Sequence, residues 1–178
     1  MIKRLLLGLL LGVSITASAQ DPQFTQFYAN PMYLNPAFAG SARCPRVAIN
    51  YRNQWPALKK TYITTSASYD QHFDMLNGGV GLMVMNDKAG EGTIATTNIS
   101  GIYAYQLNIN RKLSMRFGLQ GTYVQKKLDW DKLTFGDMID PRYGFVYETQ
   151  EVRPKESRSF MDFSSGMIIY SKIGRAHV

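Results

Sequence analysis

The chain has 178 residues, of which 45% are hydrophobic and 19% charged, and its formal net charge is +7. This length suits a single domain. Two positive charges (Lys3, Arg4) lie in a leader described next and one (Arg175) in the last residues, which leaves an unremarkable +4. No block of Lys and Arg interleaves with aromatic residues, so the composition speaks against a nucleic-acid partner. The single cysteine, Cys44, cannot form an internal disulfide.

Residues 1–19 have the pattern of a secretory signal peptide. MIKRLLLGLLLGVSITASA has a basic start, an apolar run over residues 5–13 and the small-residue pattern Ala17-Ser18-Ala19. This order predicts cleavage after Ala19. The apolar run is too short to span a bilayer as a helix. We therefore expect the mature chain to work outside the cytoplasm.

Residues 20–45 form a segment rich in proline and aromatic residues. It reads QDPQFTQFYANPMYLNPAFAGSARCP and holds four prolines. Because proline fixes its own φ and lacks an N–H donor, this segment cannot lie in the middle of a sheet. Its many aromatic and apolar side chains also make it a poor solvent-exposed linker.

From residue 46 onward, apolar and polar residues alternate with a period of two. The clearest stretch is LSMRFGLQGTYVQK, residues 113–126, in which Leu113, Met115 and Phe117 oppose Ser114 and Arg116. Such alternation is typical of half-buried strands. We expect six strands, at about 46–55, 61–70, 78–86, 93–107, 113–127 and 159–171.

The last three strands favour a membrane barrel over a soluble sandwich. They reach or exceed the roughly nine to eleven residues that a tilted transmembrane strand needs. Their polar faces carry full charges, which a dry core would not accept unpaired but a water-filled lumen would. The predicted fold is an all-β, antiparallel transmembrane β-barrel of the outer membrane. The residues expected to face its lumen are Arg52, Arg116, Gln120 and Lys126.

The lengths of the connections fix an orientation. The link at 108–112 is short, and the link at 128–158 is long and mostly polar. Outer-membrane barrels have short periplasmic turns and long surface loops. A periplasmic N-terminus then puts the short link in the periplasm and the long loop outside.

About six strands cannot close a barrel, because the smallest such barrels have eight. The chain also ends in IGRAHV, residues 173–178, which match the translation of a common sequencing adapter. We therefore expect 46–172 to be the N-terminal part of a barrel and 173–178 to be an artefact. The alternative is that several copies share one barrel.

Metal and catalytic signals are weak. Asp129, Asp131, Asp137 and Asp140 lie close together in the long loop, but the residue order of a calcium loop is missing, so a solvated loop is expected. His72 follows a strand and has no nucleophile motif near it. The glycines of GGVGL, residues 78–82, are expected to allow tight curvature or close strand approach. We expect no enzyme, cofactor or metal site.

The string QFTQFYANPMYLNPAFAG, residues 23–40, resembles the N-terminal signature of the PorP/SprF family. The resemblance continues through YRNQWPAL (51–58), GGVGL (78–82), LDWDKLTFGDMIDPRYGF (128–145) and DFSSGMIIY (162–170). Family members are normally longer. The resemblance implies a non-enzymatic outer-membrane protein of the type IX secretion system. Its expected role is in export or surface attachment of cargo such as adhesins and in gliding motility, with other secretion components and an exported protein as partners.

The resemblance suggests a task for the segment 20–45. We expect it to pack into or against the periplasmic mouth of the barrel, where it plugs the lumen or docks a partner. A lead-in with packing value only is the alternative. The candidate residues are Phe24, Phe27, Tyr28, Asn30, Pro31, Leu34, Asn35, Pro36, Phe38 and Gly40. Two other functions stay open: a general diffusion porin and a secreted soluble β-barrel binding protein.

Overall fold

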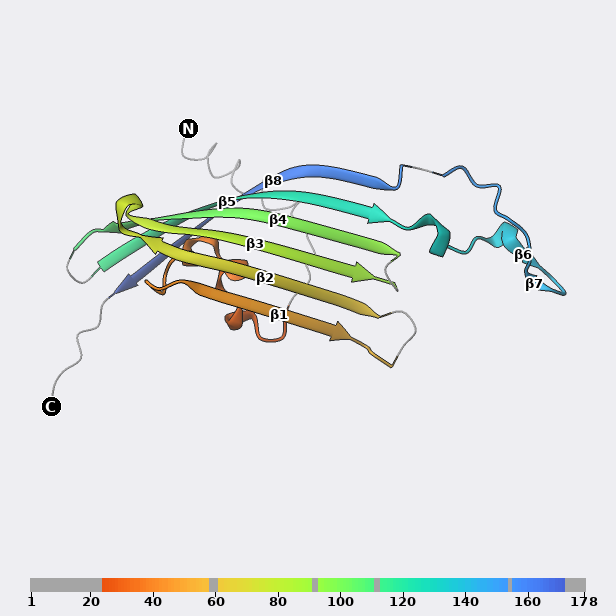
Figure 1. Cartoon of the computed structure of the whole chain (residues 1–178), viewed down its shortest axis with the longest axis horizontal. Coiled ribbons are helices and arrows are strands. Elements are labelled where there is room, and N and C mark those ends of the chain that lie inside the picture. The colour runs from red at the N-terminus through yellow and green to blue at the C-terminus, as the bar shows by residue number, and fades with distance from the viewer. Residues whose placement is uncertain (1–23, 58–60, 91–92, 111–112, 154, 172–178) are drawn as a thin grey trace, which may run out of the picture.

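The computed structural model describes residues 24–57, 61–90, 93–110, 113–153 and 155–171. One six-stranded antiparallel sheet dominates it, and each strand pairs with the one before it in that sheet (Figure 1). The strands are β1 (Arg46–Gln54), β2 (Tyr62–Phe73), β3 (Gly78–Ala89), β4 (Ile94–Asn108), β5 (Leu113–Leu128) and β8 (Ser157–Ser171). The prediction of an all-β fold with about six antiparallel strands is confirmed.

Strands β2 and β3 run past their predicted ends at residues 70 and 86. For β2 the cause is the tight connection to β3, in which η3 (Asp74–Leu76) is followed by Asn77 in the left-handed conformation at φ 45°. Asparagine tolerates this conformation better than most residues. Pairing therefore continues up to Phe73 and Gly78, which are direct neighbours across the hairpin.

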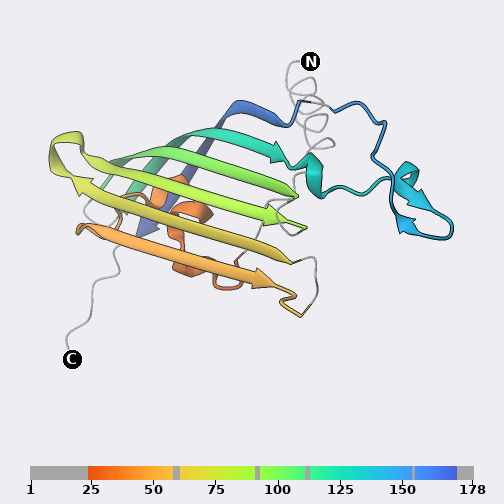
Figure 2. The same ribbon diagram turned by 45° about the vertical axis from the view of Figure 1, so that its right-hand side comes forward.

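The sheet is curved but not closed (Figure 2). Within the described residues, β1 pairs only with β2 and β8 only with β5, so the sheet has two free edges. None of the described helices has both the length and the apolar character needed to cross a membrane.

The two faces of the sheet have the reverse polarity of a soluble protein. On the concave face, Thr64, Ser66, Ser68 and Asp70 of β2 are all buried. The convex face instead exposes large apolar side chains on every strand. They include Val47, Ile49, Tyr51, Tyr69, Val80, Leu82, Val84, Ile99, Tyr103, Tyr105, Phe117, Leu119, Tyr123, Met161, Phe163, Met167 and Ile169. An exposed apolar surface of this extent marks an interaction with an apolar partner or phase.

The two ends of the sheet differ in their connections. At one end, which we call the short-turn end, lie the links at 74–77 and 109–112. At the other, the loop end, lie the links at 55–61 and 90–93 and the long link at 129–156. The long link carries η4 (Trp130–Lys132), η5 (Gly136–Met138) and a small hairpin of β6 (Ile139–Asp140) and β7 (Gly144–Phe145). This hairpin extends well beyond the sheet (Figure 1).

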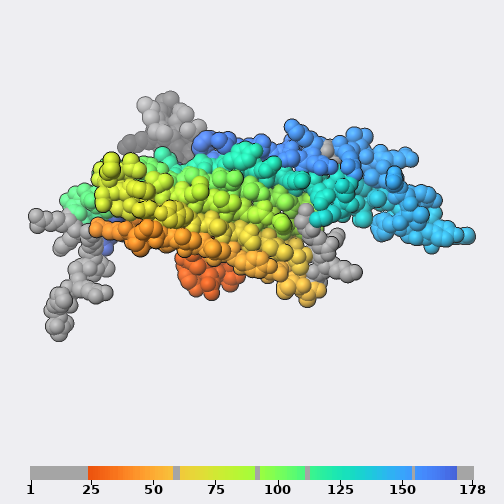
Figure 3. Space-filling model, in the orientation of Figure 1, coloured from red at the N-terminus to blue at the C-terminus, as the bar shows by residue number. Residues whose placement is uncertain are grey.

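Residues 24–45, which we call the N-terminal segment, lie on the concave face (Figures 1 and 2). The segment contains η1 (Phe27–Ala29), α2 (Pro31–Leu34) and η2 (Pro36–Phe38). Figure 3 shows the opposite side, a broad surface of strand residues with the segment visible only beside β1. The core joins the two parts, because Met32 and Ala39 of the segment pack with Met83, Ile102 and Ala104 of the sheet.

Candidate functional site

A row of very small residues crosses the concave face. In the strand register, Gly79 of β3 lies opposite Ala104 of β4, Ala104 opposite Gly118 of β5, and Gly118 opposite Gly166 of β8. We call these four residues the glycine row. Because they carry no side chain beyond a methyl group, they leave a shallow channel that runs across the strands.

Residues 35–40 of the N-terminal segment lie in this channel. A Cβ atom added to Gly166 would overlap the side chain of Asn35, and one added to Gly118 would overlap the backbone of Pro36 and Ala37. A Cβ on Gly79 would overlap Ala39. The segment thus crosses from β8 toward β3 with its backbone directly on the strands.

The sequence of the segment explains its shape here. The side chain of Asn35 accepts a hydrogen bond from the backbone N–H of Ala37 at 2.9 Å, and Pro36 begins η2. An asparagine whose side chain bonds the backbone two residues further on is a common turn former. The proline that follows it has its own φ fixed at the value that the second position of a turn needs. The Asn35 amide also donates to the carbonyl of Met167 on β8 at 3.4 Å.

The glycines of GGVGL were expected to allow curvature or close strand approach. Gly78 does meet the neighbouring strand closely, since a Cβ there would overlap the carbonyl of Ala104. Gly79 and Gly81 instead make room for the N-terminal segment, with the sulfur of Met32 against Gly81. The pattern in the sequence did not reveal this second use.

Asp70 holds the end of the segment. Its side chain is 2% exposed and forms a two-pronged ion pair with Arg46, whose Nε and Nη2 both donate to it at 2.8 Å. The backbone N–H of Gly40 also donates to Asp70, at 2.7 Å. Two-pronged pairs of this kind are stronger and more specific in geometry than single ones. The carboxylate therefore joins the segment, β1 and β2.

Arg116 provides a second anchor from β5. Its side chain is buried, and its Nη2 donates to the carbonyl of Ala39 at 2.8 Å. The buried Nε atom has no hydrogen-bond partner within the described part of the chain. Its charge is attracted by Asp70. Arg116 lies under the segment rather than in open space.

The predicted residues of the segment divide between two sides. Phe24, Asn30 and Gly40 are buried, and the Asn30 amide donates to the hydroxyl of Ser66 at 3.2 Å. Pro31, Asn35, Pro36 and Phe38 are partly buried. Phe27, Tyr28 and Leu34 are each more than half exposed. One side of the segment rests on the sheet, and the other presents apolar side chains away from it.

The other three residues predicted to face a lumen also lie on the concave face. Arg52 is paired in register with the buried Thr64, and its Nη2 donates to Gln54 at 2.7 Å. The amide of Gln120 donates to Thr122 at 3.0 Å and to Ser100 at 3.3 Å. Lys126 lies exposed near the loop end.

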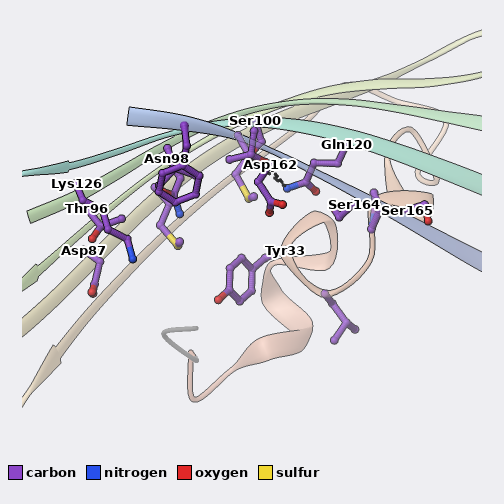
Figure 4. Close-up of a pocket in the computed structure, with 17 residues that line it drawn as sticks. Tyr33, Asp87, Thr96, Asn98, Ser100, Gln120, Lys126, Asp162, Ser164 and Ser165 are labelled. Carbon is purple, nitrogen blue, oxygen red and sulfur yellow. Dashed lines mark hydrogen bonds between the residues drawn. The ribbon is translucent and has the colours of Figure 1, made fainter. Parts of the chain in front are cut away.

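A polar cavity of about 720 Å³ opens on the loop side of the segment (Figure 4). Tyr33 of the segment lies on one side of it, and Asp87, Asn98, Lys126 and Asp162 project from the strands on the other. Within the described ranges, no three His, Cys, Asp or Glu side chains gather in a metal-binding group. The cavity is lined by polar side chains with both signs of charge, Lys126 opposite in sign to Asp87 and Asp162.

A family model described as "Type IX secretion system membrane protein PorP/SprF" matches residues 16–178. The chain belongs to the PorP/SprF family. The resemblance noted in the sequence is thereby confirmed, and the protein is a membrane component of the type IX secretion system. No curated protein and no solved structure gives a significant match to it.

In this PorP/SprF protein, the string LNPAFAG occupies the glycine row. Asn35 and Pro36 form the turn, Ala37 and Ala39 lie against the strands, and Gly40 reaches Asp70. Each small residue of the string is thus matched by a small residue of the sheet. The sequence analysis singled out the string LNPAFAG but not the row of small residues on the sheet.

The carboxylates of the long loop of the PorP/SprF protein have separate partners. Asp129 pairs with Lys132 at 3.4 Å, and Asp131 pairs with Arg153. Asp137 accepts hydrogen bonds from the backbone of Gln150 and the hydroxyl of Thr149, and Asp140 accepts them from the backbones of Arg142 and Tyr143. Those bonds lower the pKa of both Asp137 and Asp140. The carboxylates order the loop rather than converge on one point.

Proposed function

We propose that this PorP/SprF protein is a non-enzymatic outer-membrane scaffold that supports export or surface attachment of cargo such as adhesins, and through it gliding motility. Its six-stranded sheet would be the N-terminal part of a transmembrane barrel. The observation that carries the proposal is the reversed polarity of the sheet, with apolar side chains exposed on the convex face and polar ones buried on the concave face.

Strand length supports the position in the membrane. Strands β4, β5 and β8 have 15, 16 and 15 residues. A tilted strand needs only about nine to eleven residues to cross the hydrocarbon core. The surplus extends into the interfacial regions, and the apolar convex face would meet the lipid.

The connections support an orientation. Short turns belong on the periplasmic side of outer-membrane barrels and long loops on the outside. The N-terminal segment lies against strand residues near the short-turn end, since Gly79 is close to the start of β3 and Gly118 to that of β5. It would therefore plug the lumen from the periplasmic side, after removal of the signal peptide.

The exposed side of the segment suggests the partner contact. Phe27, Tyr28 and Leu34 are each more than half exposed, and Leu34 also borders the polar cavity. Aromatic residues are enriched where proteins bind one another. We assign this side to another component of the secretion system, while the long loop would face exported cargo outside the cell.

The test is a complementation experiment in a strain that lacks the gene. The variant carries Phe27→Ser, Tyr28→Ser and Leu34→Ser, and the control carries Met75→Ser, which changes a 97% exposed side chain at the same end of the sheet. We expect both proteins in the outer membrane at normal levels, with cargo display lost only in the triple variant. Normal display by the triple variant would remove the docking role of the segment.

The polar cavity favours a diffusion porin as the second candidate function. The two functions differ in conductance, because a lumen plugged by the N-terminal segment stays closed in planar bilayers. We expect no steady channels from the wild-type protein. Steady channels of wild-type protein would establish the porin instead.

A further inference from the structure

The convex face carries a groove that the proposed function does not use. It has a volume of about 420 Å³ and is formed by Gly101, Tyr103, Leu119, Gly121 and Phe163. We call it the outer groove. Gly101 and Gly121 lie opposite each other on β4 and β5 and form its floor. A Cβ atom added to Gly101 would have open space around it.

The walls of the outer groove are apolar and held in place. Tyr103 and Leu119 are cross-strand neighbours on one side, and the ring of Phe163 lies over Gly121 on the other. The hydroxyl of Tyr103 donates to the carbonyl of Leu76 at 2.8 Å, which fixes that wall to the β2–β3 turn. Among the residues that the structure describes, none that lines the groove is charged.

The position of the groove along the strands indicates which part of a lipid could reach it. Gly101 is the middle residue of β4 (Ile94–Asn108), and Gly121 and Phe163 lie near the middles of β5 and β8. For strands that cross a membrane, these positions lie at the midplane of the bilayer. The methyl ends of acyl chains meet there, and lipid headgroups do not reach that depth.

The shape of the face selects the occupant. The sheet is convex on this side (Figure 2), and two convex surfaces touch only along a narrow line. A second copy of the chain would therefore bury little area, whereas a flexible hydrocarbon chain can follow the floor of the groove.

We propose that the outer groove binds the methyl-terminal part of a lipid acyl chain. This inference rests on the membrane-spanning position proposed above. The occupied groove would order one chain against β4, β5 and β8 at a fixed depth, while chains elsewhere on the convex face stay fluid.

The experiment uses the full chain in liposomes of phosphatidylcholine that carries a photoreactive diazirine at the methyl end of one acyl chain. After irradiation, mass spectrometry locates the labelled residues. Tyr69 and Leu82 are the internal reference, because they are exposed residues of the convex face in the same cross-strand row as Gly101. An acyl chain in the groove makes several van der Waals contacts more than one on the open face. We therefore expect labelling at Tyr103, Leu119 and Phe163 to exceed labelling at Tyr69 and Leu82 on the order of fivefold.

Two variants sharpen the result. Gly101→Leu fills the groove from a position where an added Cβ atom has open space around it, and we expect it to abolish the enrichment. Ala67→Leu adds the same side chain to an exposed position on β2 and should leave the enrichment unchanged. Equal labelling of the groove residues and of Tyr69 and Leu82 would overturn acyl-chain binding in the groove, while the proposed membrane-spanning position would stand. No labelling on the convex face at all would overturn both.

Discussion

Gly118 of β5 and Ala37 of the N-terminal segment approach so closely that a Cβ atom on Gly118 would overlap the backbone nitrogen of Ala37. The contact joins residues far apart in the sequence. It exists because the strand register places four small residues in one row and because the segment has small residues, Ala37 and Ala39, where it crosses Gly118 and Gly79. The position of the segment on the sheet is therefore set by backbone fit as well as by its hydrogen bonds.

Replacing Gly118 should displace the segment. In Gly118→Val the new side chain meets backbone, which cannot rotate away, so we expect a loss of about 1–3 kcal/mol in stability, as for other overpacked sites. Hydrogen–deuterium exchange of residues 35–40 should speed up while the strands stay protected. The matched control is Gly101→Val, where the side chain enters open space and exchange of residues 35–40 should not change.

Asp70→Asn should loosen the same segment by a different route. The change leaves Arg46 without its carboxylate, and breaking a fully buried pair costs about 3–5 kcal/mol. Since Arg46 keeps 27% exposure, we expect a smaller loss, about 2–3 kcal/mol in the free energy of unfolding. Asp74→Asn removes a carboxylate that pairs with His72 but is fully exposed, and urea titrations should show an unchanged unfolding midpoint. Equal effects of the two changes would contradict the anchoring role.

The long loop should lose order in acid. Hydrogen bonds from the backbones of Gln150 and Arg142 lower the pKa of Asp137 and Asp140, respectively, below the ordinary 3.8. A lowered folded-state pKa means that the contribution is present above the ordinary value and disappears as the pH falls through the folded one. Limited proteolysis of residues 137–150 should therefore accelerate below about pH 4. In a variant with Asn at both positions, the rate should no longer depend on pH.

The native thiol offers a test of orientation. Cys44 is exposed and precedes β1 at the short-turn end, whereas Tyr143 is 80% exposed at the tip of the loop. In intact cells, a maleimide that cannot cross the outer membrane should leave Cys44 unmodified. It should react with Tyr143→Cys made in a Cys44→Ser background. Reaction at Cys44 alone would invert the proposed topology.

The sequence predicted the strands well, for a simple reason. Each strand is long enough for a period of two to repeat several times, as in β5, and the repeat is visible without any knowledge of the partners. The end of β3 at Ala89, which is followed by Gly90 at φ 63°, was missed as well. The end of β2 at Phe73 was missed because it depends on the conformation of Asn77 in the turn. That conformation is a property of one residue and leaves no periodic signal.

The position of the N-terminal segment on the sheet could not be predicted in the same way. Alternation assigns Gly79, Gly118 and Gly166 to one face of their strands, but it does not say that they share one row. That requires the register of three strand pairs at once. Arg116 was predicted on the polar face of its strand. Its hydrogen-bond partner, the backbone carbonyl of Ala39, could not be predicted, because every residue has a carbonyl and the sequence does not mark the one that is used. The turn at Asn35 and Pro36 depends on local chemistry, so the sequence alone can indicate it.

The glycine row also sets an order of events during assembly. The N-terminal segment is synthesised before any strand, but part of its binding surface, Gly166 and the carbonyl of Met167, is on β8. This surface is complete only when the last of the six strands has paired. The segment can therefore dock fully only after β8 has joined the sheet, and its complete docking marks the pairing of all six strands.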